Sequence, residues 1–221
     1  MKIFYFLIFF LFSCDNNKKS SEKTSEQTSL TPPQPKKDSS DLAINYWVDK
    51  LNGNKYYLPD SFANKPASFY LNNPDVSAIA KALYNGTFRP EDNDSTTLLL
   101  ALVTTGNNET RPFYRWCLDL TIQISDGALA EYPGEPALKY AIKFPKEFLT
   151  YMNSDTTMGR YGRWTEIITY SGLPSFDKDS AYNYNYIVRR MSGNCKDCPR
   201  QALDSIKIFA KEVTAGKKKL D

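Results

Sequence analysis

The sequence predicts an all-α fold, a single globular domain of about seven or eight helices. Apolar side chains recur at intervals of three and four residues through most of the chain after residue 41, which is the period of an amphipathic helix. Short turns that contain glycine or proline separate these segments, and strands do not alternate with helices as they do around a parallel sheet. We expect the domain to span residues 41–221.

The first fourteen residues form a segment of their own. Lys2 precedes an apolar run from Ile3 to Phe12, and Ser13 and Cys14 follow. As a helix this run would span roughly 15 Å, about half of the hydrocarbon core of a bilayer. A charged start, a short apolar run and a small residue at its end indicate a secretory signal peptide and not a transmembrane helix.

The ending Leu11-Phe12-Ser13-Cys14 resembles the lipobox of bacterial lipoproteins. The resemblance implies that residues 1–13 are a signal peptide that is removed, and that lipidated Cys14 anchors the mature chain to a membrane of the bacterial cell envelope. The alternative is an ordinary cleaved signal with a cysteine here by chance. Residues 14–40 then form a tether, and the polar, proline-containing composition after Cys14 predicts disorder.

Eight segments of the domain have helical character. The first carries an apolar stripe from Ile44 to Leu51 and ends at Gly53, and the clearest runs from Arg111 to Ile124. Pro145 kinks or restarts the fifth segment. In chain order the segments are 44–51, 74–84, 94–103, 111–124, 136–152, 161–172, 181–193 and 199–216.

Three stretches are harder to assign. Residues 54–71 have no helical period, and we expect their aromatic side chains to pack as a loop against the core. The run 98–103 is apolar nearly all round, which places it at the centre of the core, as a helix or as a buried strand. Residues 181–188 alternate with period two, but the helical neighbours and the ending at Gly193 favour a helix over a strand.

The predicted helices follow one another in consecutive pairs of similar length. This order resembles an irregular HEAT-like helical array, although no sequence repeat of fixed period accompanies it. The resemblance implies an arrangement of stacked helix pairs and nothing about function.

Composition excludes several classes of function. The net charge is +3 with acidic and basic residues interspersed, so we expect no nucleic-acid partner. The run Lys217-Lys218-Lys219 is interpreted as a solvated tail, with a lipid or polyanion contact as the alternative. Histidine is absent, which excludes a Ser-His-Asp or Cys-His pair and a histidine-ligated metal or haem. Glycine-rich phosphate loops and EF-hand motifs are also absent, and we expect no cofactor.

Cys195 and Cys198 are the most specific local signal in the domain. They precede Pro199, so Cys198 lies near a predicted helix N-terminus, where a thiolate is favoured. In an oxidising envelope we expect a structural disulfide, either Cys195–Cys198 or one of the two with Cys117. Thiol-disulfide exchange and free thiols are the alternatives. Zinc is excluded because three cysteines without histidine do not supply its ligands.

Three tyrosines are candidate partner contacts. Tyr182, Tyr184 and Tyr186 cannot all face the core from one helix, so we expect at least one to be exposed to a partner.

The tryptophans and several carboxylates have plainer interpretations. Trp47, Trp116 and Trp164 lie in apolar stripes and are predicted core residues, with a stacking platform for sugar or peptide as the alternative. The carboxylates on and after the clearest helix are interpreted as capping and surface residues, because no further motif supports a glycosidase pair. They are Asp119, Asp126, Glu131 and Glu135.

The sequence therefore favours a lipid-anchored envelope protein whose helical domain binds another envelope or secreted protein. An inhibitor or immunity protein is one version of that function. One alternative is an enzyme that carries out thiol-disulfide exchange through Cys195 and Cys198. The other is a protein that binds glycan or peptidoglycan with exposed aromatic side chains. A role without catalysis is favoured, and no catalytic residue is assigned.

Overall fold

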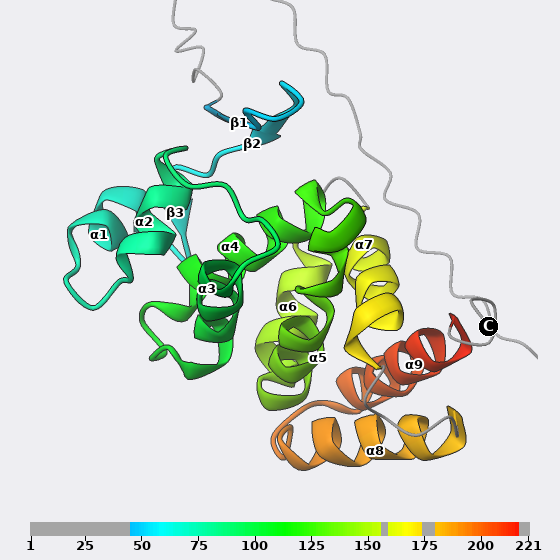
Figure 1. The fold of residues 1–221 in the computed structure, drawn as a ribbon. Helices are drawn as coiled ribbons and strands as arrows, with labels where there is room; N and C mark the ends of the chain where they lie inside the picture. Colours follow the sequence, from blue (N-terminus) through cyan, green and yellow to red (C-terminus); the bar gives the residue numbers. More distant parts are fainter. Residues whose placement is uncertain (1–44, 156–158, 174–179, 217–221) are drawn as a thin grey trace, which may run out of the picture. The chain divides into compact units, whose positions relative to one another are not determined.

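Helices make up most of what the computed structural model describes, which is residues 45–155, 159–173 and 180–216 (Figure 1). The predicted helical character is confirmed at this level, but short strands precede the helices. The strands are β1 (Tyr46–Val48), β2 (Lys55–Tyr57), β3 (Ser61–Phe62) and β4 (Lys65–Pro66). The helices are α1 (Ala67–Asn72), α2 (Ala78–Tyr84), α3 (Asp94–Thr105), α4 (Arg111–Ile124), α5 (Gly134–Lys143), α6 (Pro145–Asn153), α7 (Arg160–Ile167), α8 (Ser180–Gly193) and α9 (Arg200–Gly216).

The first described element corrects the prediction of a helix at 44–51. β1 pairs antiparallel with β2, with Tyr46 opposite Tyr57. Gly53 lies in the turn between them with a φ of 74°, a left-handed conformation that glycine adopts without steric cost. The expectation of a purely helical domain is therefore wrong at this end. The glycine that was expected to end a helix closes a β-hairpin.

Two buried side chains fix the inner face of this hairpin. The indole nitrogen of Trp47 donates to the carbonyl of Leu83 in α2 at 2.7 Å. Asp49 is fully buried, and Arg89 donates to its carboxylate oxygens from Nε at 2.7 Å and from Nη2 at 3.2 Å. The Arg89 guanidinium holds the pKa of the Asp49 carboxyl below its usual value. The hairpin is thus bonded to α2 and to the connection between α2 and α3.

The segment 54–71, which was expected to be a loop, contains regular structure. β3 and β4 pair antiparallel around Ala63 and Asn64, whose φ values of 47° and 64° make a tight two-residue turn. α1 follows β4 directly. Phe62 and Tyr70 are buried, which confirms the expected packing of this segment's aromatic side chains for these two, whereas Tyr57 is exposed.

α4 joins two aromatic clusters of the core. Its bounds confirm the prediction of a helix over Arg111–Ile124. The cluster beside α1 and α2 consists of Phe62, Tyr70, Tyr84, Phe113 and Trp116. The cluster among the later helices consists of Tyr140, Phe148, Tyr151, Trp164 and Phe209. Between them they contain most of the buried aromatic side chains among the described residues.

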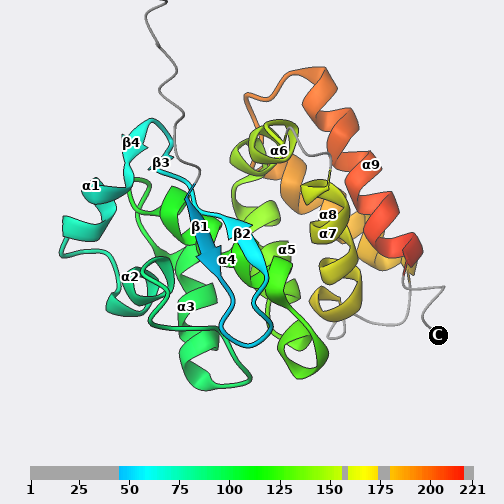
Figure 2. The same ribbon diagram turned by 90° about the horizontal axis from the view of Figure 1, so that it is seen from above.

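The other helices follow the predictions with four adjustments. The predicted helix 161–172 consists of α7 and a π-helical segment, Ile168–Gly172. α2 begins at Ala78, four residues after Pro74. The run 98–103, expected at the centre of the core, is helical and buries Leu99, Leu100 and Val103, but Leu98 is 63% exposed, so one face of it lies outside the core. Phe144 separates α5 from α6, so Pro145 restarts the helix and does not kink it. The helical interpretation of residues 181–188 is confirmed by α8, which lies beside α9 (Figures 1 and 2).

Several sequence predictions concern residues outside the described ones. These are the signal peptide 1–13, the lipidated Cys14, the tether to residue 40 and the basic run 217–219. The described residues all belong to one compact unit, Leu42–Asp221. Among them, no helix has the length and apolar character needed to cross a membrane.

Candidate functional site

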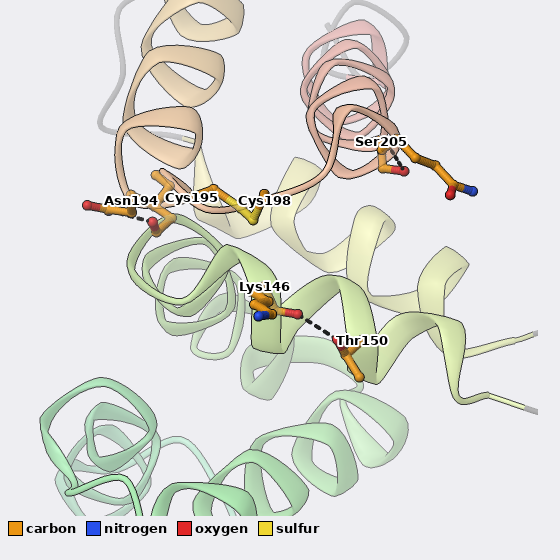
Figure 3. Close-up of a disulfide and its surroundings, with 8 residues drawn as sticks. Lys146, Thr150, Asn194, Cys195, Cys198 and Ser205 are labelled. Atoms are coloured by element: carbon orange, nitrogen blue, oxygen red, sulfur yellow. Dashed lines mark hydrogen bonds between the residues drawn. A yellow bond between two sulfur atoms is a disulfide. The ribbon is translucent and has the colours of Figure 1, made fainter.

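Cys195 and Cys198 form a disulfide in the turn between α8 and α9 (Figure 3). Cys195 is 4% exposed and Cys198 is half-buried, while Lys196 and Asp197 between them are exposed. Cys117 is a free thiol, fully buried in α4, so neither cysteine is paired with it. Burial raises the pKa of the Cys117 thiol, which keeps it protonated and unreactive.

We expect loss of this disulfide to lower stability moderately. The bond closes a loop of only three residues' separation, for which chain entropy predicts a loss of about 2 kcal/mol, or roughly 4–8 °C in Tm. The Cys195→Ala/Cys198→Ala variant and the reduced wild-type chain should therefore show the same decrease in thermal unfolding. An unchanged Tm in both would contradict a structural role and favour a redox role for the pair.

Of the three candidate contact tyrosines, the structure describes the side chains of two. Tyr184 and Tyr186 are half-buried and pack against the core from α8, with Asn183 and Ile187 fully buried beside them. The side chain of Tyr182 lies outside the described part. Partner contact by these tyrosines stays a prediction.

The tryptophans and carboxylates fall largely where they were expected. Trp47, Trp116 and Trp164 are 3%, 6% and 0% exposed, which confirms that they are core residues. Asp126, Glu131 and Glu135 are exposed. The prediction of a surface position is wrong for Asp119, which is 4% exposed because α7 covers this side of α4.

A cluster of exposed apolar side chains lies on the outer face of the β1–β2 hairpin. Tyr46, Val48 and Tyr57 point away from Trp47 because successive side chains of a strand alternate between its two faces. Leu51, in the turn that follows β1, is a fourth exposed apolar side chain of the hairpin. Their exposed fractions are 49%, 45%, 63% and 69% for Tyr46, Val48, Tyr57 and Leu51. We call these four residues the hairpin surface.

A pocket of about 290 Å³ adjoins the hairpin surface through Tyr57, which belongs to both. Its walls come from α4, α6, α7 and the β2–β3 connection. Three guanidinium groups, two carboxylates and one phenol line it, and we call it the arginine pocket. These side chains are Arg115, Arg160, Arg163, Asp119, Asp155 and Tyr151.

The Tyr151 ring positions two of the arginines. The Cζ atoms of Arg115 and Arg160 lie 4.1 Å and 4.0 Å from its ring centroid, within cation–π distance. Burial, reinforced by the nearby Asp119 carboxylate, raises the pKa of Tyr151 well above its usual value. The ring therefore stays neutral and presents an aromatic face to both cations.

The two carboxylates of the pocket are held by groups on several elements. Asp119 accepts hydrogen bonds from Trp164 Nε1 at 2.6 Å and from Gln123 Nε2 at 3.1 Å, and lies 3.6 Å from Arg160 Nε. Asp155 accepts from the backbone amides of Gly159 and Arg160 at 2.9 Å and 2.6 Å, which caps the N-terminus of α7. Both carboxylates are thus fixed by the fold.

Arg163 differs from the other arginines of the pocket. Its Nε is buried, and among the described residues its guanidinium has no hydrogen-bond or ion-pair partner. A β-carbon on Gly159 would lie 2.5 Å from Arg163 Nη1, so the glycine leaves the space that this guanidinium occupies. The fold thus positions this charged group without a direct hydrogen-bond or ion-pair partner among the described residues.

A larger groove, of about 1040 Å³, also borders α7 and shares Gln123 and Arg163 with the arginine pocket. Its lining is mostly apolar and uncharged, and one of its acidic residues, Glu212, accepts a hydrogen bond from Tyr161 at 2.5 Å. Its charged residues are Arg163, which also lines the arginine pocket, Glu166 and Glu212, whereas five charged side chains converge on the smaller pocket. The arginine pocket is therefore the better candidate for specific recognition.

Neither the hairpin surface nor the arginine pocket was predicted as a site. Asn52-Gly53 between two apolar runs is a hairpin signal that the helical stripe at 44–51 obscured. Arg160 and Arg163 stand three apart on α7, but 45 residues separate Arg115 from Arg160, so only the fold brings them together. Within the described part of the chain, no group of three or more metal-ligating side chains occurs.

No protein-family model matches this chain, and no curated protein and no solved structure is significantly similar to it. Proposals about its function therefore rest on its own residues.

Proposed function

We propose that the chain is a lipid-anchored protein of the bacterial envelope whose domain binds another protein through the hairpin surface. The observation that carries this is the cluster of Tyr46, Val48, Leu51 and Tyr57, all of which are at least 45% exposed. Contiguous exposed apolar side chains on a folded domain mark interaction sites, and tyrosine is enriched at the energetic centres of such sites.

The hairpin has further properties of a binding element. Its sheet has only two strands, so the outer edge of each strand lacks a strand partner within that sheet. The buried pair Asp49–Arg89 and the Trp47 hydrogen bond hold it in place, so little ordering is needed when a partner binds. A preorganised face with tyrosines, and with strand edges that no described strand pairs with, suits a protein partner better than a small molecule.

The anchor and the architecture belong to the same proposal. Cys14, after the lipobox-like Leu11-Phe12-Ser13, would carry the lipid, and residues 14–40 would connect it to the domain. Consecutive helices pack in pairs, as α3 does with α4, α5 with α6 and α8 with α9, which supports an irregular HEAT-like array. An inhibitor or immunity protein is one version of the function, in which the partner is a toxin or lytic enzyme of the envelope.

Substitution of the hairpin tyrosines tests this proposal. The full chain with a C-terminal affinity tag should recover one envelope or secreted protein in near-equal amount after mild crosslinking. The Tyr46→Ser/Tyr57→Ser variant should lose that protein, because each tyrosine supplies exposed contact area without a role in the core. Leu98→Ser, a matched change at an exposed position of α3, should retain it. Equal recovery by both variants would exclude the hairpin surface.

A further inference from the structure

The arginine pocket contains buried donors that the described fold does not satisfy. The Nε atoms of Arg115 and Arg163 are buried without a hydrogen-bond acceptor among the described residues. Arg115 still donates from Nη1 to the Tyr140 hydroxyl at 3.2 Å, whereas Arg163 has no such contact with a described residue. A buried donor without an acceptor is unfavourable, and folded proteins satisfy nearly all of them. Among the described residues these donors have no acceptor, and a ligand can supply one.

We propose that the arginine pocket binds the carboxylate of an acidic side chain presented by the protein partner, an inference that rests on the proposed function. Guanidinium groups bind carboxylates through two parallel hydrogen bonds in one plane, a geometry that the flat Arg163 fork provides. Arg115 and Arg160, held over the Tyr151 ring, surround the same space.

The charge of the pocket favours a carboxylate over a phosphate group. Three guanidinium groups face the two carboxylates Asp119 and Asp155, which leaves an excess of one positive charge. A singly charged carboxylate neutralises that excess. A doubly charged phosphate would exceed it and would lie close to two fixed carboxylates.

The position of the pocket identifies the source of the carboxylate. Tyr57 belongs both to the hairpin surface and to the pocket rim, so a protein that covers the hairpin reaches the pocket with its next side chains. A volume of about 290 Å³ accommodates the end of an aspartate or glutamate side chain and is small for a nucleotide. Charge complementarity then adds specificity to the apolar contact.

A titration of the full chain in neutral detergent tests the ligand chemistry without a known partner. The probes are N-acetylglutamate amide, its uncharged glutamine counterpart and inorganic phosphate, and arginine Nε–Hε resonances are followed by NMR. The glutamate probe should shift the Arg163 resonance at millimolar concentrations and bind more tightly than the other two. Arg163→Gln should weaken its binding about tenfold, the effect of one charge-assisted hydrogen bond.

Two further variants separate binding from folding. Methionine has a similar length to arginine, and Arg163→Met should weaken binding of the glutamate probe as Arg163→Gln does. Neither change should lower the midpoint of thermal unfolding, because Arg163 has no described hydrogen-bond or ion-pair partner. Arg189→Gln removes an exposed arginine of α8 and should leave the affinity unchanged. An Arg163 resonance that does not respond, or equal binding of the glutamate and glutamine probes, would overturn the inference. Binding of phosphate as tight as that of glutamate would overturn it too.

Recovery of the partner by Arg163→Glu distinguishes this inference from the proposed function. Suppose that the tagged full chain recovers a protein and that the Tyr46→Ser/Tyr57→Ser variant loses it. If Arg163→Glu loses that protein too, both the proposed function and the carboxylate inference are supported. If Arg163→Glu retains that protein, the carboxylate inference fails and the proposed function stands. If the glutamate probe binds but no protein is recovered, a free small carboxylate is the ligand and the assignment to a protein partner fails.

Discussion

Replacement of Trp164 by alanine is expected to lower the free energy of unfolding by about 3–5 kcal/mol. The side chain is fully buried among Tyr140, Phe148 and Tyr151, whose ring centroids lie 6.0–6.1 Å from its own. Alanine would leave a large cavity between α5, α6 and α7. It would also remove the 2.6 Å hydrogen bond that Trp164 donates to the buried Asp119 carboxylate. Urea unfolding followed by far-UV circular dichroism measures the change.

Two control variants separate the cavity from the hydrogen bond. Trp164→Phe retains an aromatic ring but leaves Asp119 without the indole donor, so we expect a smaller loss of about 1–3 kcal/mol. Leu98→Ala at an exposed position should stay within about 0.5 kcal/mol of the wild type. A loss for Trp164→Ala no greater than that for Leu98→Ala would contradict the packing described for the second aromatic cluster.

Replacement of Arg89 by alanine should have an effect of similar size, about 3–5 kcal/mol. Asp49 is fully buried, and the variant would leave its carboxylate without a cation. The double variant Asp49→Asn/Arg89→Met removes both charges and should lose less stability than Arg89→Ala alone. Arg189→Ala, at an exposed position of α8, is the matched control and should have little effect.

The contribution of this ion pair should depend on pH in one direction. Arg89 lowers the pKa of Asp49 in the folded state, so the stabilisation is present above the unfolded pKa of about 3.9 and is lost as the pH falls through the lower folded value. The difference in unfolding free energy between wild type and Arg89→Ala should therefore be largest at neutral pH and narrow as the pH is lowered, because Asp49 becomes protonated first in the variant, where burial raises its pKa without the opposing guanidinium, and then in the wild type. A difference that does not change down to pH 3 would contradict the assignment.

Local sequence patterns predicted most of the helices because those helices bury one continuous face. α9 shows this most clearly, since its buried residues recur at intervals of three and four: Ile206, Phe209, Ala210, Val213 and Thr214. The stripe from Ile44 to Leu51 was misleading because its spacing suits a helix as well as a strand with a turn. Long-range bonds decide between them, from Trp47 to Leu83 and from Arg89 to Asp49. A local pattern contains no information about such partners.

The candidate site was less predictable than the fold for a related reason. Its parts are unremarkable alone, as an exposed tyrosine, a helical arginine and a glycine are common in any domain. Tyr57, Arg115 and Arg163 become a site because the hairpin, α4 and α7 converge. Asp119 illustrates the same point. It has the sequence pattern of a surface residue, but α7, distant in the sequence, covers it in the fold.

Photo-crosslinking from the hairpin surface in intact cells tests the central claim most directly. A photoreactive amino acid at position 57 of the full chain, and separately at position 46, should crosslink the same envelope or secreted protein. The same amino acid at position 98 on α3 or position 208 on α9, both exposed, should not. Crosslinks to one protein from 46 and 57 alone are the predicted result. No crosslinked protein from either position, or equal crosslinking from all four, would contradict binding through the hairpin surface.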